Sequence, residues 1–307
     1  MSPHKRQIQV SRAFLPFLDR FFFFFFFSCL FFLSSLSGKK LIPARGFAKV
    51  LSEQEAATRL QSYRSFVGRD LNQSSYHQAY AFRFRLRHMP RRGDEFSRNG
   101  TIYGLALGHG LSRIDIDPVP SQSFPPKFLL QNGPKPKVWI YSSADKKSSL
   151  LTEAEFFQPL IKGMNQSPFD LLMPFVFWEA DYVKSGRVAG RPAHLYSFES
   201  PQWVKETKPE CAEIILALDT KYEAPLRIET FARSDVPNRT FILNSLKKVN
   251  DHWIVKSIDC KDRINRSTTR FEVTAAALNL DFDLSLFSEG GLLNNPVIPE
   301  EAFISTK

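Results

Sequence analysis

The sequence has few of the residue types on which most enzyme and metal sites depend. It contains three cysteines and six histidines in 307 residues, and the histidines share no spacing that would suit metal ligands. The patterns Gly-x-Ser-x-Gly and His-Glu-x-x-His and a phosphate-binding glycine loop are all absent. A hydrolase would need a polar cluster that the sequence does not show. We therefore predict a protein that is not an enzyme and has no metal and no cofactor.

A continuous apolar run long enough to cross a membrane is also missing, although the N-terminus is strongly apolar. Basic residues precede a phenylalanine-rich run at 21–33, and small residues follow it. The run is shorter than the roughly 20 residues that a membrane-spanning helix needs, and this order of segments is typical of a secretory signal. We predict three regions: a signal peptide at 1–37, a flexible linker at 38–48 and one folded domain at 49–307.

Alternatives to this N-terminal prediction stay open. Cleavage near Ala48 is a second option, and an uncleaved membrane anchor is a third. Cys29 has apolar neighbours that do not suit a lipidation site, so we treat it as part of the signal. Beyond the signal only Cys211 and Cys260 remain, and in an oxidising compartment they could form one disulfide.

The chain is basic, with a net charge of +10. Residues 1–37 contribute +3 of this charge, and the remaining residues contribute +7. A basic strand could in principle contact nucleic acid, but export argues against a nucleic-acid partner. We expect a periplasmic location instead.

Strand-like runs dominate the rest of the chain. Tyr80, Phe82, Phe84 and Leu86 alternate with arginines, which predicts a strand with one buried face. About eleven such runs follow one another through connections short enough to require antiparallel neighbours. Because strand twist accumulates, a sheet of this size curls into a closed barrel or a half-barrel. The runs are 80–87, 101–107, 111–116, 127–130, 138–141, 193–199, 212–219, 224–231, 239–247, 252–260 and 269–275.

Helices are predicted in two places. The first spans 51–68, where Ser52 and Glu55 form a capping-box pattern. Its apolar side chains repeat at helical spacing, so one face is buried. The second region is a helical insertion at about 150–182 between the two halves of the sheet. After Leu280 the sequence is apolar but broken by glycine and proline, and we expect it to cover an edge of the sheet.

The insertion contains the most apolar segment beyond the signal, from Ser167 to Trp178. Ser167 suits a helix N-cap, Pro168 the first helical position and Asp170 the positive helix end. Pro174 then bends or stops the helix. A kinked aromatic segment of this kind must lie across an apolar surface.

The order of this segment, SPFDLLMPFVFW, followed by GRPAH at 190–194, resembles the outer-membrane lipoprotein-sorting proteins, relatives of the periplasmic lipoprotein carriers LolA and LolB. The resemblance covers about residues 50–290. It implies an incomplete barrel whose helices cover a pocket for lipid acyl chains, and thus a carrier of lipoproteins or lipid-like ligands. In that family an arginine in the cavity holds the lid closed through hydrogen bonds, but the order of segments does not identify its counterpart here.

Candidate ligand-binding residues follow from the first strand and the insertion. An ordinary hydrophobic core is the alternative interpretation of all of them, and an envelope protein without a cavity, with a structural or interaction role, is the alternative function. The basic side chains of the first strand form a solvated outer face or attract anionic lipid during transient membrane-surface contact. We expect a monomer. The candidate residues are Phe82, Phe84, Leu86, Phe169, Leu172, Met173, Phe175 and Trp178.

Overall fold

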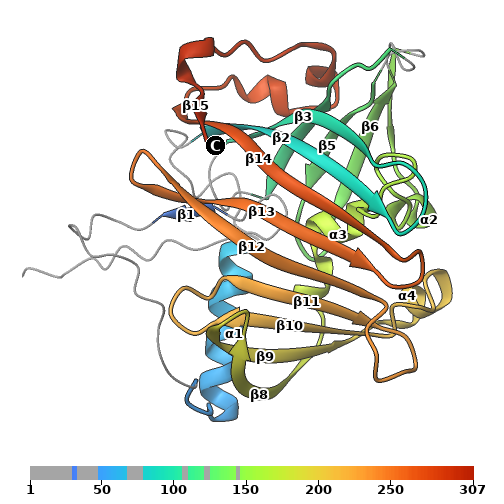
Figure 1. The fold of residues 1–307 in the computed structure, drawn as a ribbon, viewed down its shortest axis with the longest axis vertical. Coiled ribbons are helices and arrows are strands. Elements are labelled where there is room, and N and C mark those ends of the chain that lie inside the picture. The colour runs from blue at the N-terminus through green and yellow to red at the C-terminus, as the bar shows by residue number, and fades with distance from the viewer. Residues whose placement is uncertain (1–29, 33–47, 68–78, 106–109, 121–124, 143–145) are drawn as a thin grey trace, which may run out of the picture.

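A single antiparallel sheet runs through the protein (Figure 1). The computed structural model describes residues 30–32, 48–67, 79–105, 110–120, 125–142 and 146–307. The sheet has fifteen strands in the order β7-β6-β5-β4-β3-β2-β14-β13-β12-β11-β10-β9-β8, while β1 pairs with β13 and β15 with β14. The strands are β1 Leu30–Phe32, β2 Ala79–Pro90, β3 Phe96–Gly104, β4 Leu111–Ile116, β5 Lys127–Gln131, β6 Lys137–Ser142, β7 Lys147–Leu150, β8 Ala180–Val188, β9 Arg191–Glu199, β10 Glu213–Asp219, β11 Pro225–Phe231, β12 Arg239–Val249, β13 His252–Asp262, β14 Ser267–Leu280 and β15 Ile304–Ser305.

The predicted fold class is confirmed: the protein is mainly β, and the curled sheet is not closed into a barrel. The two ends of the strand order, β7 and β8, are not paired with each other. Each of the eleven predicted runs overlaps a strand. The four further strands, β1, β7, β8 and β15, lack the alternating apolar pattern or are very short. In β8 only Val188 is buried, which is typical of an edge strand that faces solvent.

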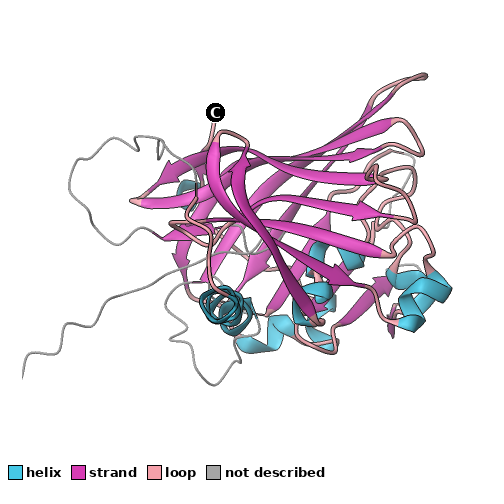
Figure 2. Ribbon diagram, turned by 90° about the horizontal axis from the view of Figure 1, so that it is seen from below, coloured by secondary structure: helices cyan, strands magenta, loops and turns pink. Residues whose placement is uncertain are grey.

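α1 and the helices between β7 and β8 lie on the concave side of the sheet (Figure 2). α1 buries Ala56, Leu60, Tyr63 and Val67, the face that its sequence period predicts. Of the described helices, none is long and apolar enough to span a bilayer. The α-helices are α1 Glu53–Val67, α2 Glu153–Phe156, α3 Pro168–Leu172 and α4 Gln202–Thr207, and the 3-10 helices are η3 Pro174–Phe177, η4 Leu284–Phe287, η5 Gly290–Leu293 and η6 Glu300–Ala302.

The segment after Leu280 lies elsewhere than predicted. It packs on the convex face of β2 to β5 rather than at a sheet edge, through a second apolar cluster that includes Tyr103, Leu129, Phe287 and Leu292. Arg113 of β4 is fully buried beneath it. Its guanidinium pairs with Asp115 at 2.8 Å and donates hydrogen bonds to backbone carbonyls of the segment, Gly291 at 2.8 Å and Asn294 at 2.6 Å. The carbonyls of the segment thus supply hydrogen-bond acceptors for the buried Arg113 guanidinium, whose burial the strand alternation alone does not explain.

Several N-terminal predictions lie outside the described residues. These are the signal peptide, apart from Leu30–Phe32, which pairs with His252–Ile254 of β13, and all of the linker except Ala48. Cys211 and Cys260 are free, buried thiols. Burial raises the pKa of each to about 12, so both stay protonated at neutral pH and are poor nucleophiles.

The N-terminal end of α1 is held to the sheet edge through His194. Ser185 Oγ lies 2.8 Å from His194 Nδ1 and donates to the carbonyl of Lys49 at 2.6 Å. Tyr182 Oη accepts the backbone N–H of Leu51 at 3.2 Å. Burial, and next the charge of Arg59, lower the pKa of His194 from 6.5 to about 4. The imidazole is therefore neutral in the folded protein near neutral pH.

This depressed pKa predicts acid sensitivity well above the range where most carboxylates titrate. Between about 4 and 6.5 the unfolded chain binds a proton at His194 that the folded chain excludes. The contribution of His194 to stability is thus fully present above its pKa in the unfolded chain, and it is lost as the pH falls toward its pKa in the folded protein. Going from about pH 7 to about pH 5, urea unfolding should show a loss on the order of 1–2 kcal/mol from this group.

His194→Gln should reduce this dependence of the unfolding free energy on pH without abolishing it, because burial also lowers the pKa of His88 and His252. An equal pH dependence in the variant and the wild type would contradict the role given to His194.

Candidate functional site

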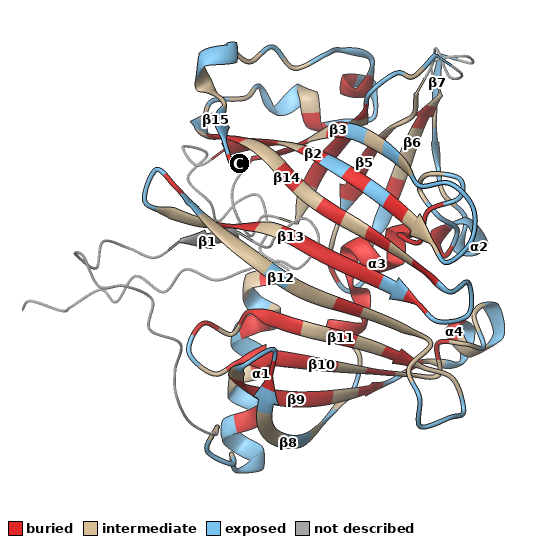
Figure 3. Ribbon diagram, viewed as in Figure 1, coloured by how far each residue is buried: buried red, intermediate tan, exposed pale blue. Residues whose placement is uncertain are grey.

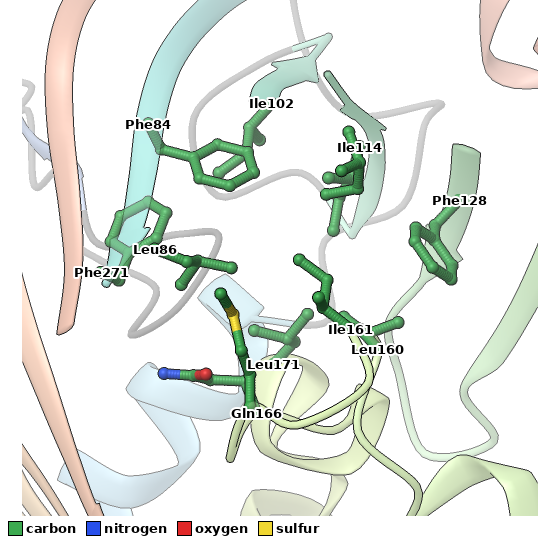
Figure 4. A pocket seen from close by; sticks show the side chains of 12 residues that line it. Phe84, Leu86, Ile102, Ile114, Phe128, Leu160, Ile161, Gln166, Leu171 and Phe271 are labelled. Atoms are coloured by element: carbon green, nitrogen blue, oxygen red, sulfur yellow. The ribbon is translucent and has the colours of Figure 1, made fainter. Parts of the chain in front are cut away.

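The inward face of the sheet and the segment between β7 and β8 enclose an apolar pocket (Figure 4). In β2 the alternation is as predicted: Phe82, Phe84 and Leu86 are buried, while Arg85 and Arg87 are exposed. The neighbouring strands present apolar side chains on the same concave face. Side chains between α2 and α3 close the pocket from the other side. The lining residues are Phe84, Leu86, Ile102, Ile114, Ile116, Phe128, Phe271, Leu160, Ile161, Met164, Gln166 and Leu171.

The pocket is almost entirely apolar, and the side chains that line it leave little free volume. Gln166 is the one polar lining residue. Its amide nitrogen donates to the carbonyl of Thr269 at 3.3 Å, and its Oε1 has no hydrogen-bond partner among the described residues. The free volume is about 20 Å³, enough for about one water molecule. A long acyl chain can therefore enter only if the covering segment moves away from the sheet.

The covering segment, residues 151–179, is called the lid below. Its α-helices begin with capping side chains, as predicted for Ser167. Thr152 and Glu155 form one capping box and Ser167 and Asp170 another, with Pro168 in the first turn. Pro174 then ends the α-helical part, and Met173 adopts a left-handed conformation with φ of 46°. A short α-helix, α3, is thus followed directly by a short 3-10 helix, η3.

The predicted ligand-binding residues fall into two groups. Phe84 and Leu86 line the pocket, whereas the other six do not. Phe169, Phe175 and Trp178 pack against one another in the lid in tilted and edge-to-face arrangements, with ring centroids 5.9–6.4 Å apart. Phe82 stacks on Tyr80 at 4.6 Å, and Leu172 and Met173 are buried in the same continuous apolar cluster. The lid residues on our list therefore pack on one another and on the main core rather than line the pocket.

The other pocket residues belong to patterns that were visible in the sequence. Leu160 and Ile161 stand in the apolar group after α2, and Ile114 and Phe128 lie in predicted strands. Which of many apolar side chains face one pocket depends on the curl of the sheet, for which the sequence carries no local signal. Figure 3 shows that buried residues are spread over most strands of the sheet.

A buried ion pair ties the lid to the sheet. Arg239, the first residue of β12, donates to the Asp170 carboxylate of α3 at 2.9 Å and to the carbonyl of Asn165. Both side chains are largely buried, with 14% and 5% exposed. Burial would by itself lower the pKa of Arg239, but Asp170 and then Cys260 raise it further than burial lowers it. The guanidinium is thus firmly charged.

Polar lid residues next to this ion pair bond to the inner face of the sheet. The backbone N–H of Asn165 donates to Thr269 Oγ1 at 3.3 Å, and its side-chain carbonyl accepts from Ser267 Oγ at 3.0 Å. At the far end of the lid, Arg64 of α1 donates to the carbonyls of Val176, at 2.5 Å, and Trp178. The lid is thus fixed by directional polar contacts in its middle, at Asn165 and Asp170, and near its C-terminal end, at Val176 and Trp178.

The outer face of β2 carries paired rather than free cations. Arg83 pairs with Glu300, Arg85 with Glu272 at 2.8 Å and Arg87 with Glu95. These contacts favour the solvated-face interpretation of the three arginines. Across the described residues, no group of three or more acidic, histidine or cysteine side chains is placed to hold a metal ion.

Together, the open antiparallel sheet, the helices on its concave face and the lid-covered apolar pocket define a LolA-like fold. No protein-family model and no curated protein matches the sequence. Solved structures do match it. One is a domain from Vibrio parahaemolyticus named for outer-membrane lipoprotein sorting, with a TM-score of 0.62 and 13% identity, over 78% of this chain and 100% of that one.

Two further structures have the same fold. A DUF1329 family protein from Desulfovibrio piger has a TM-score of 0.60 and 13% identity, over 78% of this chain and 98% of its own. A LolA superfamily protein from Nitrosomonas europaea has a TM-score of 0.54 and 11% identity, over 76% and 97% of the two chains. The resemblance read from the order of segments is thus confirmed at the level of the fold.

Proposed function

We propose that this protein is a non-enzymatic carrier for lipoproteins or lipid-like hydrophobic molecules, which works as an exported, periplasmic monomer and contributes to outer-membrane lipoprotein sorting. The observation that carries the proposal is the pocket whose walls are apolar except for Gln166 and whose cover is a separate segment held by polar contacts in its middle and near its C-terminal end. The fold of the structural neighbours supports it as well.

The energetics of acyl chains explain why such a lid is useful. Each methylene removed from water contributes about 0.8 kcal/mol, so one long chain resists leaving a membrane by on the order of 10 kcal/mol. A carrier must offer comparable apolar surface and still release its cargo. A lid that fills the pocket when cargo is absent lowers the affinity by the cost of moving it, because binding must first displace the lid's own side chains.

Specific acyl binding is tested by Ile161→Glu. Ile161 is a half-buried pocket residue of the lid, so a carboxylate there would face acyl chains while the variant keeps its fold. We expect the wild type to bind a fluorescent fatty acid and a triacylated peptide, and the variant to bind them about tenfold more weakly or worse. The matched control is Leu293→Glu, at an apolar side chain of η5 that is 56% exposed.

A second candidate function is supported by the small volume of the pocket. A space of about 20 Å³ is also what an envelope protein with a packed core and a structural or interaction role would have. That function would stand, and the carrier proposal would fall, if neither the wild type nor a variant with a loosened lid bound acyl probes. Native mass spectrometry of protein purified from the cell envelope should show bound lipid if the carrier proposal is correct.

A further inference from the structure

A polar groove of about 510 Å³ lies at the end of the sheet, away from the apolar pocket. It is bounded by the end of β2, by the β13–β14 turn and by the β11–β12 loop. Four cations line it: Arg91, Lys261, Arg263 and Arg266. The backbone N–H of Arg91 donates to the carbonyl of Arg266 at 2.9 Å, and that of Arg263 to the carbonyl of Asn238 at 2.8 Å. These bonds join the three segments into one structure.

Strand register places the floor of the groove on the convex face. Thr240, Lys261, Thr268 and Met89 stand opposite one another in four neighbouring strands, and directly opposed residues share a face. The next residue of β14, Thr269, is fully buried and contacts the lid from the concave face. The groove and the anchor of the lid therefore lie on opposite faces of the same strand ends.

The cations of the groove differ from those beside it. All four are exposed, and among the described residues none has an ion-pair partner, whereas Arg85, Arg87 and Arg270 each pair with a carboxylate. Asp262 is the one carboxylate in the lining, and it faces Arg239 and Asn265. Uncompensated guanidinium groups of this kind suit phosphate oxygens, which they can bind with two parallel hydrogen bonds.

Exposed apolar side chains flank the cations. Ile264, in the turn between Arg263 and Arg266, is 60% exposed, and Val236, at the opposite wall, is 44% exposed. Free phosphate makes no use of apolar side chains beside its site. A bilayer surface offers both headgroup phosphates and an apolar layer beneath them, so cations next to apolar tips suit that surface.

We propose that this groove is a docking site for the phosphate headgroups of an anionic lipid bilayer. The inference rests on the proposed function, since a carrier must meet a membrane to load or deliver its cargo. Docking would bring the strand ends next to Arg239, the residue that anchors the middle of the lid, against the membrane surface.

The test compares three forms of the full folded domain in vesicle flotation: the wild type, Arg263→Gln/Arg266→Gln, and the control Lys135→Gln/Lys137→Gln. The control removes two equally exposed charges from the β5–β6 hairpin, outside the groove. Vesicles are phosphatidylcholine with or without phosphatidylglycerol. Since each cation near an anionic surface contributes roughly fivefold in affinity, the groove variant should bind anionic vesicles about 25-fold more weakly. The control should bind like the wild type.

Two further measurements distinguish lipid headgroups from free phosphate as the ligand, and test the docking site separately from the carrier function. Inorganic phosphate, compared with chloride at equal ionic strength, should compete only weakly with vesicles. Equal flotation of the groove variant and the wild type would overturn the site, as would an equal loss in the control, or binding of inorganic phosphate without binding of vesicles. Fatty-acid binding measured without vesicles should be unchanged in the groove variant, so failure of the carrier proposal would be seen separately.

Discussion

Arg239→Met is expected to destabilise the protein by about 3–5 kcal/mol at neutral pH, because it leaves the Asp170 carboxylate buried without its counter-charge. Asp170 is only 5% exposed and is surrounded by the lid and the sheet. Adding Asp170→Asn should recover most of the loss, since an amide can still accept the capping bonds from Ser167 without a buried charge. Urea unfolding of the two variants and the wild type measures both effects.

The control is Arg85→Met, which breaks an ion pair on the outer face where Arg85 is 48% exposed. Exposed pairs contribute about 0–1 kcal/mol, so this variant should unfold close to the wild type. If Arg239→Met behaved like the control, the ion pair would not anchor the lid. Hydrogen exchange gives a local measure: amides of residues 165–178 should exchange faster in Arg239→Met, and those of β9 and β10 should change less.

The Arg239 anchor also bears on how cargo could enter. The polar contacts that hold the lid come from different elements, from β12 through Arg239 to the middle of the lid and from α1 through Arg64 to its C-terminal end. Loosening one of these contacts would free part of the lid while the aromatic cluster of Phe169, Phe175 and Trp178 keeps its internal contacts. The lid would then move as a body, which exposes the pocket without unfolding the segment.

Local patterns in the sequence predicted the local structure well. The buried face of α1 and the helix start at Ser167 and Pro168 depend on residues within a few positions of one another, and both are confirmed. The alternation in β2 is confirmed for the same reason. The β8 strand was missed because its side chains are mostly exposed, so no apolar period marks it.

Features that depend on distant residues could not be predicted. Arg239 and Asp170 are 69 positions apart, and Arg64 and Val176 are 112 apart, so no spacing rule relates either pair. Arg113 reads as a solvated strand residue, yet the C-terminal segment covers it completely. The same limit applies to the pocket, since the curl of the sheet decides which apolar side chains meet.

The two groups of candidate ligand residues should respond differently to truncation. Phe84→Ala and Phe169→Ala both remove a buried ring, so each should cost about 3–5 kcal/mol of stability. Phe84 lines the pocket and packs on Phe271 at 5.4 Å, whereas Phe169 packs within the lid. Phe84→Ala should therefore enlarge the pocket and tighten acyl binding, because less protein has to be displaced. Phe169→Ala should leave the affinity of the folded fraction unchanged.

Titration of each variant with a fluorescent fatty acid, under conditions where unfolding curves show it folded, measures the contrast. Weaker binding by Phe169→Ala than by the wild type would instead mean that cargo contacts the aromatic cluster of the lid.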